Sequence, residues 1–395
     1  MNVTGLKTGF NIMDPNTANM SDIGFRYVSK DYLIDVYPYL SPLRISQGEW
    51  VGGNNTYGQL GTSNTTSYSS PMQVGSLTTW QQIACGDNHT AAVKTDGTLW
   101  AWGHNDWGQL GTGDTTSYSS PVQVSALTNW QQIACGYKIT AAINTDGTLW
   151  TCGYNALGNL GDSTTVSKSS LVQVGSLTNW KQVACGQVNT VAIKTDGTLW
   201  TVGWNYYGSL GDGTTVNQSS PVQVGTLTDW KQVACGSMTA AIKTDGTLWT
   251  CGYNGFGQLG TGDTTSYSSP VQIGLLTNWI KVVCGDSHTT AIKTDGTLWG
   301  WGNNSNGQLG TNDLTSYSSP VQIGFLTNWK RVSGGSYNTS AVKTDGTVWS
   351  WGDNYYGQLM TSNTTSYSSP VQIGSLHNWK QVACGRSHTV GMLSS

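Results

Sequence analysis

The chain has 395 residues, of which only 10% are charged, and its formal net charge is −3. A nucleic-acid binder is expected to carry a large basic excess because phosphate neutralisation dominates its affinity. Here 18 Lys and Arg face 21 Asp and Glu, which argues against that class. No apolar run approaches the roughly 18 residues of a membrane span. Residues 1–10 lack the charged and apolar regions of a signal peptide. We therefore expect synthesis in the cytoplasm and no membrane insertion.

Residues 1–45 differ in composition from the rest of the chain. Aromatic and charged residues are dense between positions 22 and 38, and residues 30–36 suit one or two helical turns ended by Pro38. We predict an anchoring segment, and its candidate contact residues are Phe25, Arg26, Tyr27, Tyr32, Leu33 and Tyr37. The alternative is a strap that packs on the rim of the domain formed by residues 46–395.

Three motifs recur along residues 46–395, at a spacing of 50 residues except for one interval of 49. W-x-x-V/I-x-C-G begins at Trp80, Trp130, Trp180, Trp230, Trp279, Trp329 and Trp379, with Gly334 replacing Cys in the sixth copy. T-D-G-T-L/V-W begins at Thr95, Thr145, Thr195, Thr244, Thr294 and Thr344. G-x-N-x-x-G-x-L begins at Gly53, Gly103, Gly153, Gly203, Gly252, Gly302 and Gly352. Self-similarity at this period indicates a solenoid, an array or a propeller.

Each repeat is expected to form four strands. In the repeat that begins at Trp130, we predict strands over residues 131–135, 140–144, 148–152 and 171–174. Asp146-Gly147 between the second and third is a strong hairpin signal, typical of a type I′ turn. Four antiparallel strands per unit are a propeller blade. We predict an all-β, seven-bladed β-propeller.

The two ends of the chain complete one blade. The last repeat stops at Ser395, inside its hairpin turn, so its third strand is missing there. Residues 47–50 align with residues 97–100 and supply that strand. We predict that residues 47–53 pair with residues 387–393, which closes the ring and leaves no open sheet edge.

Units such as G-H-N-D-W-G-Q-L-G-T-G-D at residues 103–114, with D-N-H-T at 87–90 and T-D-G-T-L-W-A-W-G from Thr95, resemble the repeats of regulator of chromosome condensation (RCC1) proteins. The resemblance covers about residues 45–395. Residues 1–45 resemble short segments that precede RCC1-type propellers in marine bacteriophage proteins. The RCC1 family includes a guanine-nucleotide exchange factor, a secreted β-lactamase inhibitor and plant photoreceptors. Membership of this family therefore does not by itself indicate a function.

The strand directions define two faces of the propeller. The loop after Cys-Gly and the loop at G-x-N-x-x-G lie on one face, here called the loop face. The Asp-Gly turns and the L-T-N-W connections lie on the opposite face, here called the turn face. Across the repeats the turn face is nearly constant, whereas the loop face is diversified.

The diversified loops are rich in aromatic residues, which give binding surfaces a large contact area with few torsions to freeze. Because aromatic rings also stack on sugars, a glycan is one candidate ligand. The candidate ligand-binding residues are Trp107, Tyr154, Trp204, Tyr206, Tyr207, Tyr253, Phe256, Tyr355 and Tyr356. The alternative is that several of them pack between blades, as we expect of Trp100 and Trp150.

Other reactive residues are expected to be structural. Six of the eight cysteines occupy one repeat position, where we expect small buried thiols without disulfides. His89, His288 and His388 share a repeat position and are expected to form local hydrogen bonds. We find no Ser-His-Asp set, no paired catalytic carboxylates and no phosphate loop. We predict a non-enzymatic protein without metal or cofactor.

Three functions remain open. The leading one is a phage virion protein, displayed on a head or tail, anchored through residues 1–45 to other virion proteins, with its loop face towards a host protein or glycan. The second is a soluble, cytoplasmic interaction propeller that acts as an inhibitor or scaffold. The third is guanine-nucleotide exchange, for which no catalytic residue is identifiable.

Overall fold

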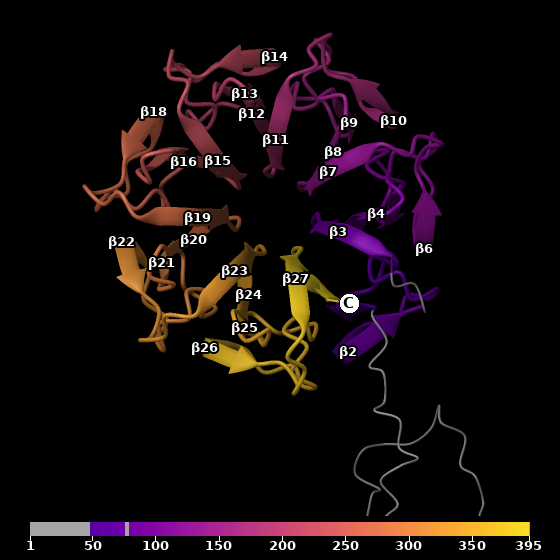
Figure 1. Ribbon diagram of the computed structural model, residues 1–395, viewed down its shortest axis with the longest axis vertical. Coiled ribbons are helices and arrows are strands. Elements are labelled where there is room, and N and C mark those ends of the chain that lie inside the picture. Colours follow the sequence, from indigo (N-terminus) through magenta and orange to yellow (C-terminus); the bar gives the residue numbers. More distant parts are fainter. Residues whose placement is uncertain (1–47, 76–78, 395) are drawn as a thin grey trace, which may run out of the picture. The chain divides into compact units, whose positions relative to one another are not determined.

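The computed structural model describes residues 48–75 and 79–394. These residues form seven four-stranded antiparallel sheets, arranged as blades around a central axis, and the described part of the chain contains no helix (Figure 1). The predicted all-β, seven-bladed propeller is confirmed.

Each blade runs from an innermost strand to an outermost strand, and we number the blades by the order of their innermost strands. The strands of blades 1–3 are β3 (Trp80–Cys85), β4 (His89–Lys94), β5 (Leu99–Gly103), β6 (Tyr118–Gln123); β7 (Trp130–Cys135), β8 (Ile139–Asn144), β9 (Leu149–Gly153), β10 (Lys168–Gln173); and β11 (Trp180–Cys185), β12 (Asn189–Lys194), β13 (Leu199–Gly203), β14 (Gln218–Gln223). Those of blades 4–6 are β15 (Trp230–Cys235), β16 (Met238–Lys243), β17 (Leu248–Gly252), β18 (Tyr267–Gln272); β19 (Trp279–Cys284), β20 (His288–Lys293), β21 (Leu298–Gly302), β22 (Tyr317–Gln322); and β23 (Trp329–Gly334), β24 (Asn338–Lys343), β25 (Val348–Gly352), β26 (Tyr367–Gln372). Blade 7 comprises β27 (Trp379–Cys384), β28 (His388–Leu393), β1 (Glu49–Gly53) and β2 (Tyr68–Val74).

Blade 7 closes the ring by joining the two ends of the chain. β1 lies between β28 and β2, with Glu49 opposite Met392 and Gly53 opposite His388. In Figure 1 the yellow C-terminal strands and the indigo β2 lie together in this blade. The predicted closure is confirmed over Glu49–Gly53, and residue 47 of the predicted pairing lies outside the described residues.

The blades are held together by apolar side chains from adjacent sheets. Between blades 1 and 2, Leu99 and Ala101 form one buried cluster with Trp130 and Ile133. The innermost tryptophan of a blade also meets a tryptophan of the third strand edge-on, as Trp130 does with its rings 6.3 Å from those of Trp150. Trp100 meets Trp80 in the same way. Trp150 and Trp100 also pack against the clusters that join their blades to the preceding ones, as expected of them.

The hairpin between the second and third strands differs from the predicted type I′ turn. In blade 3, Gly197 has a φ of 79°, but Asp196 is not among the described residues with positive φ. Gly197 N donates to Lys194 O (3.0 Å), and Lys194 N donates to Thr198 O (3.1 Å). This pattern is a three-residue loop with one left-handed glycine. The Asp196 carboxylate accepts from both the N–H and the hydroxyl of Thr198, which explains the constant T-D-G-T.

The same hairpin is tied to the connection that enters the next blade. Trp230 N donates to Gly197 O (3.1 Å). The connection is also tied to the hairpin of the blade that it enters, because Thr244 N donates to Asp229 O (2.8 Å). A Cβ on Gly197 would collide with the carbonyl oxygen of Thr228. The constancy of the Gly in T-D-G-T therefore has a backbone cause, which weakens the use of turn-face constancy as a sign that function lies on the opposite face.

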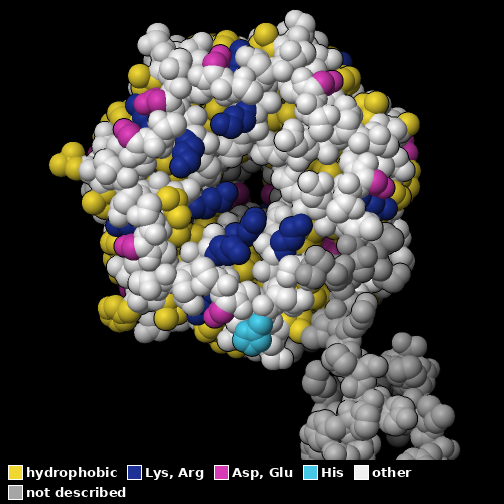
Figure 2. All heavy atoms as spheres, in the orientation of Figure 1, with side chains coloured by type: hydrophobic (Ala, Val, Ile, Leu, Met, Phe, Trp, Pro, Cys, Tyr) yellow, Lys and Arg dark blue, Asp and Glu magenta, His cyan; other side chains and the backbone are white. Residues whose placement is uncertain are grey.

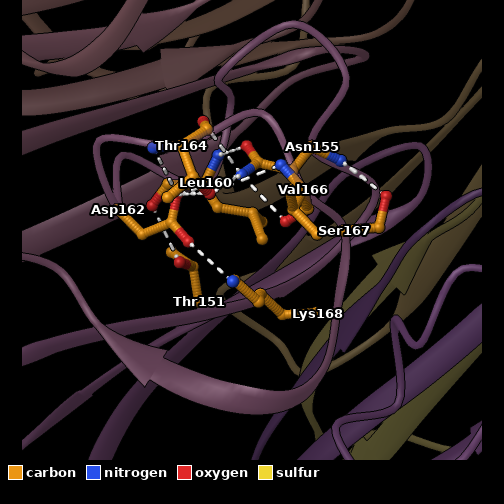
Figure 3. Close-up of polar contacts among 8 residues, drawn as sticks. All are labelled: Thr151, Asn155, Leu160, Asp162, Thr164, Val166, Ser167 and Lys168. Atoms are coloured by element: carbon orange, nitrogen blue, oxygen red, sulfur yellow. Dashed lines mark hydrogen bonds and ion pairs between the residues drawn. The ribbon is translucent and has the colours of Figure 1, made fainter.

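The constant Asn of G-x-N-x-x-G organises the long polar loop of each blade. Figure 3 shows the example of blade 2, in which the Asn155 side chain lies at the centre of the loop. Its Nδ2 donates to Asp162 Oδ1 (3.0 Å) and Thr164 O (3.1 Å), while its Oδ1 accepts from Leu160 N (2.9 Å). Asp162 also pairs with Lys168 Nζ at 3.6 Å. This Asn is a scaffold residue that fixes the loop beside the variable positions.

Candidate functional site

The two variable loops of each blade lie together, as the strand directions predict. In blade 2, the backbone N–H of Tyr154 donates to the carbonyl of Lys138 (2.9 Å), and in blade 3 Trp204 N donates to Val188 O (3.0 Å). A residue of the G-x-N-x-x-G loop is thus joined directly to the loop that follows Cys-Gly. The loop face is one continuous surface made from both sets of loops.

The candidate aromatic residues form short chains that cross from one blade to the next. The longest runs over blades 3 and 4: Trp204 and Tyr206 are stacked with centroids 6.1 Å apart, and Tyr207 lies 4.7 Å from Tyr253. Tyr253 then meets Phe256 at 6.4 Å. Tyr207 contributes the contact across the blade boundary.

A second chain joins blades 1 and 2. The rings of Trp107 and Tyr154 meet edge-on at 5.0 Å, and Lys138 Nζ lies 4.8 Å from the Trp107 centroid. Tyr355 and Tyr356 form a separate edge-on pair at 4.9 Å within blade 6. The nine candidates therefore fall into three groups, not one continuous site.

Most of these rings remain accessible. Tyr206 is 66% exposed and Tyr355 is 73% exposed, whereas Trp107 is 38% exposed. Tyr154, Trp204 and Tyr253 are half-buried beneath their neighbours. The candidates are thus neither free side chains nor members of the core between blades.

Buried amides hold several of the turns that carry these rings. Gln109 Oε1 accepts from Trp107 N (3.0 Å), and Gln258 Oε1 accepts from Phe256 N (2.9 Å). Gln358 does the same for Tyr356 (2.9 Å). Because the backbone under these rings is fixed before any ligand arrives, little conformational freedom remains to be lost on binding.

The central channel opens on the loop face through a cavity of about 70 Å³, lined by polar residues that include Asp87, Tyr137, Asp286 and Arg386. Burial, with a smaller contribution from nearby Asp286, raises the pKa of Asp87 to about 8. Arg386, whose Nη1 lies 3.6 Å from Asp87 Oδ2, opposes this shift.

The six repeated cysteines line the same cavity, and all eight cysteines are free. The prediction that they are uniformly buried was wrong: Cys85, Cys135, Cys235 and Cys284 are partly exposed. Each innermost strand ends at the channel, which leaves its terminal side chain beside that opening. Burial still raises the pKa of Cys135 to about 12, so the thiol rather than the thiolate is present at neutral pH. Among the described residues, no group of His, Cys, Asp or Glu has the geometry of a metal site.

The three repeated histidines make hydrogen bonds between blades, as expected of local structural residues. His89 Nε2 lies 2.9 Å from Thr140 Oγ1, and His288 Nε2 lies 2.9 Å from Thr339 Oγ1. His388 contacts Thr90 across the closing seam at 3.1 Å. All three are fully buried, and burial lowers their pKa to about 3, 4 and 4 in chain order.

Two features escaped the sequence reasoning. Glu49 is fully buried in β1 with neither carboxylate oxygen hydrogen-bonded, where the equivalent strands carry Leu99, Leu149 or Val348. The turn face also carries basic and apolar residues at positions where other blades have Gln or Ser. Comparing single columns of the repeat would have revealed both. The anchoring candidates Phe25, Arg26, Tyr27, Tyr32, Leu33 and Tyr37 lie outside the described residues.

The blades and their motifs define a propeller of RCC1 repeats. The RCC1-like domain family matches residues 171–395, and the regulator of chromosome condensation (RCC1) repeat matches residues 50–93, 96–143 and 146–193. The chain therefore belongs to the RCC1-like domain family. A search among curated proteins found no match.

Solved structures share the fold at low sequence identity. Human WBSCR16 is 22% identical, with a TM-score of 0.79 over 88% of this chain and 99% of that one. Prp20p from Saccharomyces cerevisiae is 19% identical, with a TM-score of 0.78 over 89% of this chain and 92% of that one. At this identity the similarity shows the fold alone. No helix in the described ranges is long and apolar enough to cross a membrane.

Proposed function

We propose that the protein is a non-enzymatic binding propeller that recognises its ligand through the aromatic groups of the loop face. The observation that carries the proposal is the chain from Trp204 through Tyr207 to Phe256, which crosses two blades while its outer rings stay accessible. Exposed aromatic rings on a fixed backbone favour binding over catalysis.

The ligand class that fits this surface best is a glycan. The rings offer apolar faces for stacking on sugars. Neighbouring polar groups, such as the Asp353 carboxylate beside Tyr355 and the Lys138 ammonium beside Trp107, offer partners for hydroxyl groups. No charge cluster of one sign dominates these groups, which favours a neutral ligand.

We further propose that this propeller is displayed on a phage particle, held by residues 1–45 to other virion proteins and made in the host cytoplasm. The low charge, the Ser-, Thr- and Asn-rich repeats and the different composition of residues 1–45 support this assignment. Residues Phe25, Tyr27 and Tyr32 would contribute to attachment.

A soluble, cytoplasmic interaction protein is the second candidate. Its support comes from the similar fold of yeast Prp20p, whose structure was reported with its binding to Gsp1p and histones. Copurification with particles favours the virion role, whereas a defined soluble partner favours the second candidate.

The ligand surface is tested by replacing Trp107, Tyr207 and Phe256 with Ala, singly and together, and measuring binding to a glycan array and to candidate host cells. We expect binding to fall at least about tenfold in the triple variant, with little change in melting temperature. The control is a triple Ala variant of Val166, Val216 and Leu314, which are exposed apolar residues of the polar loops.

Two results would contradict the ligand proposal. A stable triple variant that binds normally would exclude these rings as the binding surface. A large loss of melting temperature would identify them as packing residues instead. Attachment is tested separately in the full chain with Phe25→Ala, Tyr27→Ala and Tyr32→Ala, which should leave glycan binding intact but prevent incorporation into particles.

A further inference from the structure

The turn face carries a ring of basic residues around the mouth of the central channel. They occupy the second and third positions of the innermost strands, and we call them the basic mouth: Lys181, Lys231, Lys281, Lys330, Arg331 and Lys380. The seven innermost strands contain no Asp or Glu. Figure 2 shows Lys and Arg side chains gathered around the central hollow, with acidic side chains mainly farther out.

None of these six cations forms an ion pair within the described part of the chain. Lys380 Nζ contacts only a backbone carbonyl, that of Gln81, at 3.5 Å. Five of the six are exposed, and Lys281 is half-buried. The chain as a whole has a net charge of −3, yet these six positive charges lie together without acidic partners. They create a positive electrostatic potential at the mouth of the channel.

Two of the cations stand where the other blades have a glutamine that is hydrogen-bonded to the neighbouring innermost strand. In blade 4, Gln232 donates to Val282 O (2.8 Å) and accepts from Val282 N (2.8 Å), which joins two innermost strands. Gln82, Gln132, Gln182 and Gln381 occupy the same position and also bond to the neighbouring strand. In blades 5 and 6 this position is Lys281 and Arg331, neither of which can accept a hydrogen bond.

This replacement also brings like charges together. Burial lowers the pKa of Lys281, and the nearby Arg331 lowers it further. Blade 5 thus loses its bridging hydrogen bond and gains repulsion. In blade 6 a different bond joins β23 to β27, because Ser333 Oγ accepts from Cys384 N (3.0 Å). Local costs of this kind concentrate at functional sites.

Among the described residues, the most exposed apolar side chains of the turn face lie in the connections that enter these same two blades. Leu275 is 92% exposed and Phe325 is 96% exposed, each directly after the glycine of its connection. The equivalent positions in other blades are Ser176, Ser375, Ala126 and Thr226. Ile280, at the second strand position of blade 5, is exposed beside Lys281. Apolar and basic deviations from the repeat therefore occur in the same two blades.

We propose that the turn face over blades 5 and 6 is a docking surface for an acidic segment of a partner protein. Its carboxylates face the basic mouth, and its apolar side chains pack on Leu275, Phe325 and Ile280. Charge complementarity selects an acidic partner, and the apolar residues favour a polypeptide over a nucleic acid. This surface is separate from the aromatic groups of the loop face.

The test measures fluorescence anisotropy of labelled synthetic peptides with the full chain at low and physiological salt. One peptide alternates Glu with Phe and Leu; a second replaces Glu with Gln, and a third replaces Phe and Leu with Ser. Single-stranded DNA serves as a polyanion without apolar side chains.

The variants use residues that other blades already carry. Lys281→Gln, Lys330→Gln and Arg331→Gln together remove half of the basic mouth, and Leu275→Ser with Phe325→Ser removes the apolar pair. Lys168→Gln is the control, because it removes one charge from the outermost strand β10, outside the basic mouth, where blade 3 has Gln218 at the equivalent position.

We expect the Glu-Phe-Leu peptide to bind in a salt-dependent way. The triple Gln variant should weaken binding by about tenfold or more, the Ser variant by about fivefold, and the control by less than about twofold. Absent binding, or equal binding to all variants, would overturn the proposal. If DNA or the Glu-Ser peptide binds as tightly and the Ser variant binds normally, the surface is a polyanion site instead. The loop-face variant with Trp107, Tyr207 and Phe256 replaced should bind the peptide normally, so failure of the two proposals can be distinguished.

Discussion

The loop face and the turn face are built on the same four-stranded repeat, yet variation means different things on each. On the turn face, the Asp-Gly hairpin and the following connection hold each other in place, as Gly197 and Trp230 do. On the loop face, the backbone is fixed by buried amides such as Asn155 and Gln109, so the side chains between them are free to change. The constant Gly of the turn face is therefore explained by backbone packing. The side chains of the loop face vary because no such packing constrains them.

Variation is informative where it departs from what the scaffold favours. Tyr206 and Tyr355 occupy loop positions where many residues fit. Lys281 and Arg331 instead occupy positions where five blades use Gln to bridge their neighbours. The less varied face thus gives the sharper functional argument.

The largest expected effect lies at the first residues of β4, β20 and β28, which vary between blades but are buried. His89, His288 and His388 are held neutral because their pKa is about 3 to 4 in the folded state and 6.5 otherwise. The unfolded chain binds more protons below pH 6.5, so folding stability is lost as the pH falls from 6.5 towards 4. Replacing all three with Asn, which occurs naturally at Asn189 and Asn338, should remove up to about 2 kcal/mol of acid destabilisation per residue at pH 5.

Urea unfolding at pH 7 and pH 5 measures this difference. The triple Asn variant should show a smaller loss between the two pH values than the unmodified protein. An identical loss of stability in both proteins would show that these histidines titrate normally despite their burial.

The constraint on the turn face is tested by Gly197→Ala. The residue has a φ of +79°, and the new Cβ would collide with the Thr228 carbonyl, so we expect a destabilisation of about 2–4 kcal/mol. Gly225→Ala is the control on the same face, because its φ is +60° but nothing lies within 4 Å. Thermal unfolding should separate the two variants. Equal, small losses would remove the backbone explanation for the constant turn face.

Glu49→Leu sharpens the contrast between blade 7 and the other blades. Burial raises the pKa of Glu49 to about 8 from 4.5, so its folded form is protonated and stability is lost as the pH rises from about 4.5 through 8. Leu at this position, as at Leu99 and Leu149, should stabilise the protein by about 2–3 kcal/mol at pH 8 and by less at pH 5.

The measurement for Glu49→Leu is the unfolding midpoint at both pH values, with Leu99→Val as a control that introduces no titratable group. A variant no more stable at pH 8 than the unmodified chain would mean that the carboxylate is satisfied in solution.

The smallest expected effect is a gain from restoring the bridging glutamines. Lys281→Gln and Arg331→Gln should each stabilise the ring by about 0.5–1 kcal/mol, the value of one net hydrogen bond. Gln232→Lys is the reciprocal control, and it should destabilise the ring because it removes a bridging glutamine. A loss of stability in the two Gln variants would show that the cations are structural, which would contradict their assignment to a partner surface.

Sequence reasoning located the blades and the closing strand because the repeat supplies seven aligned copies, and residues 47–53 fit the missing part of the last one. It misjudged the Asp-Gly turn, because that dipeptide suits both a two-residue and a three-residue hairpin. The aromatic groups could not be resolved into three sets, since the contact of Tyr207 with Tyr253 depends on the spacing between blades. The exposure of Cys85 likewise depends on the width of the channel.

The closing strand also determines how the protein responds to a pulling force. In the antiparallel pair of β1 and β28, Glu49 lies opposite Met392, so the leading end of β1 and the trailing end of β28 are side by side. Tension between those two ends loads one rung of the ladder at a time and peels the strands apart. Tension between the leading end of β1 and a distant blade, directed along the strand, loads all the rungs at once. The same seam is thus mechanically weak in one direction and strong in another.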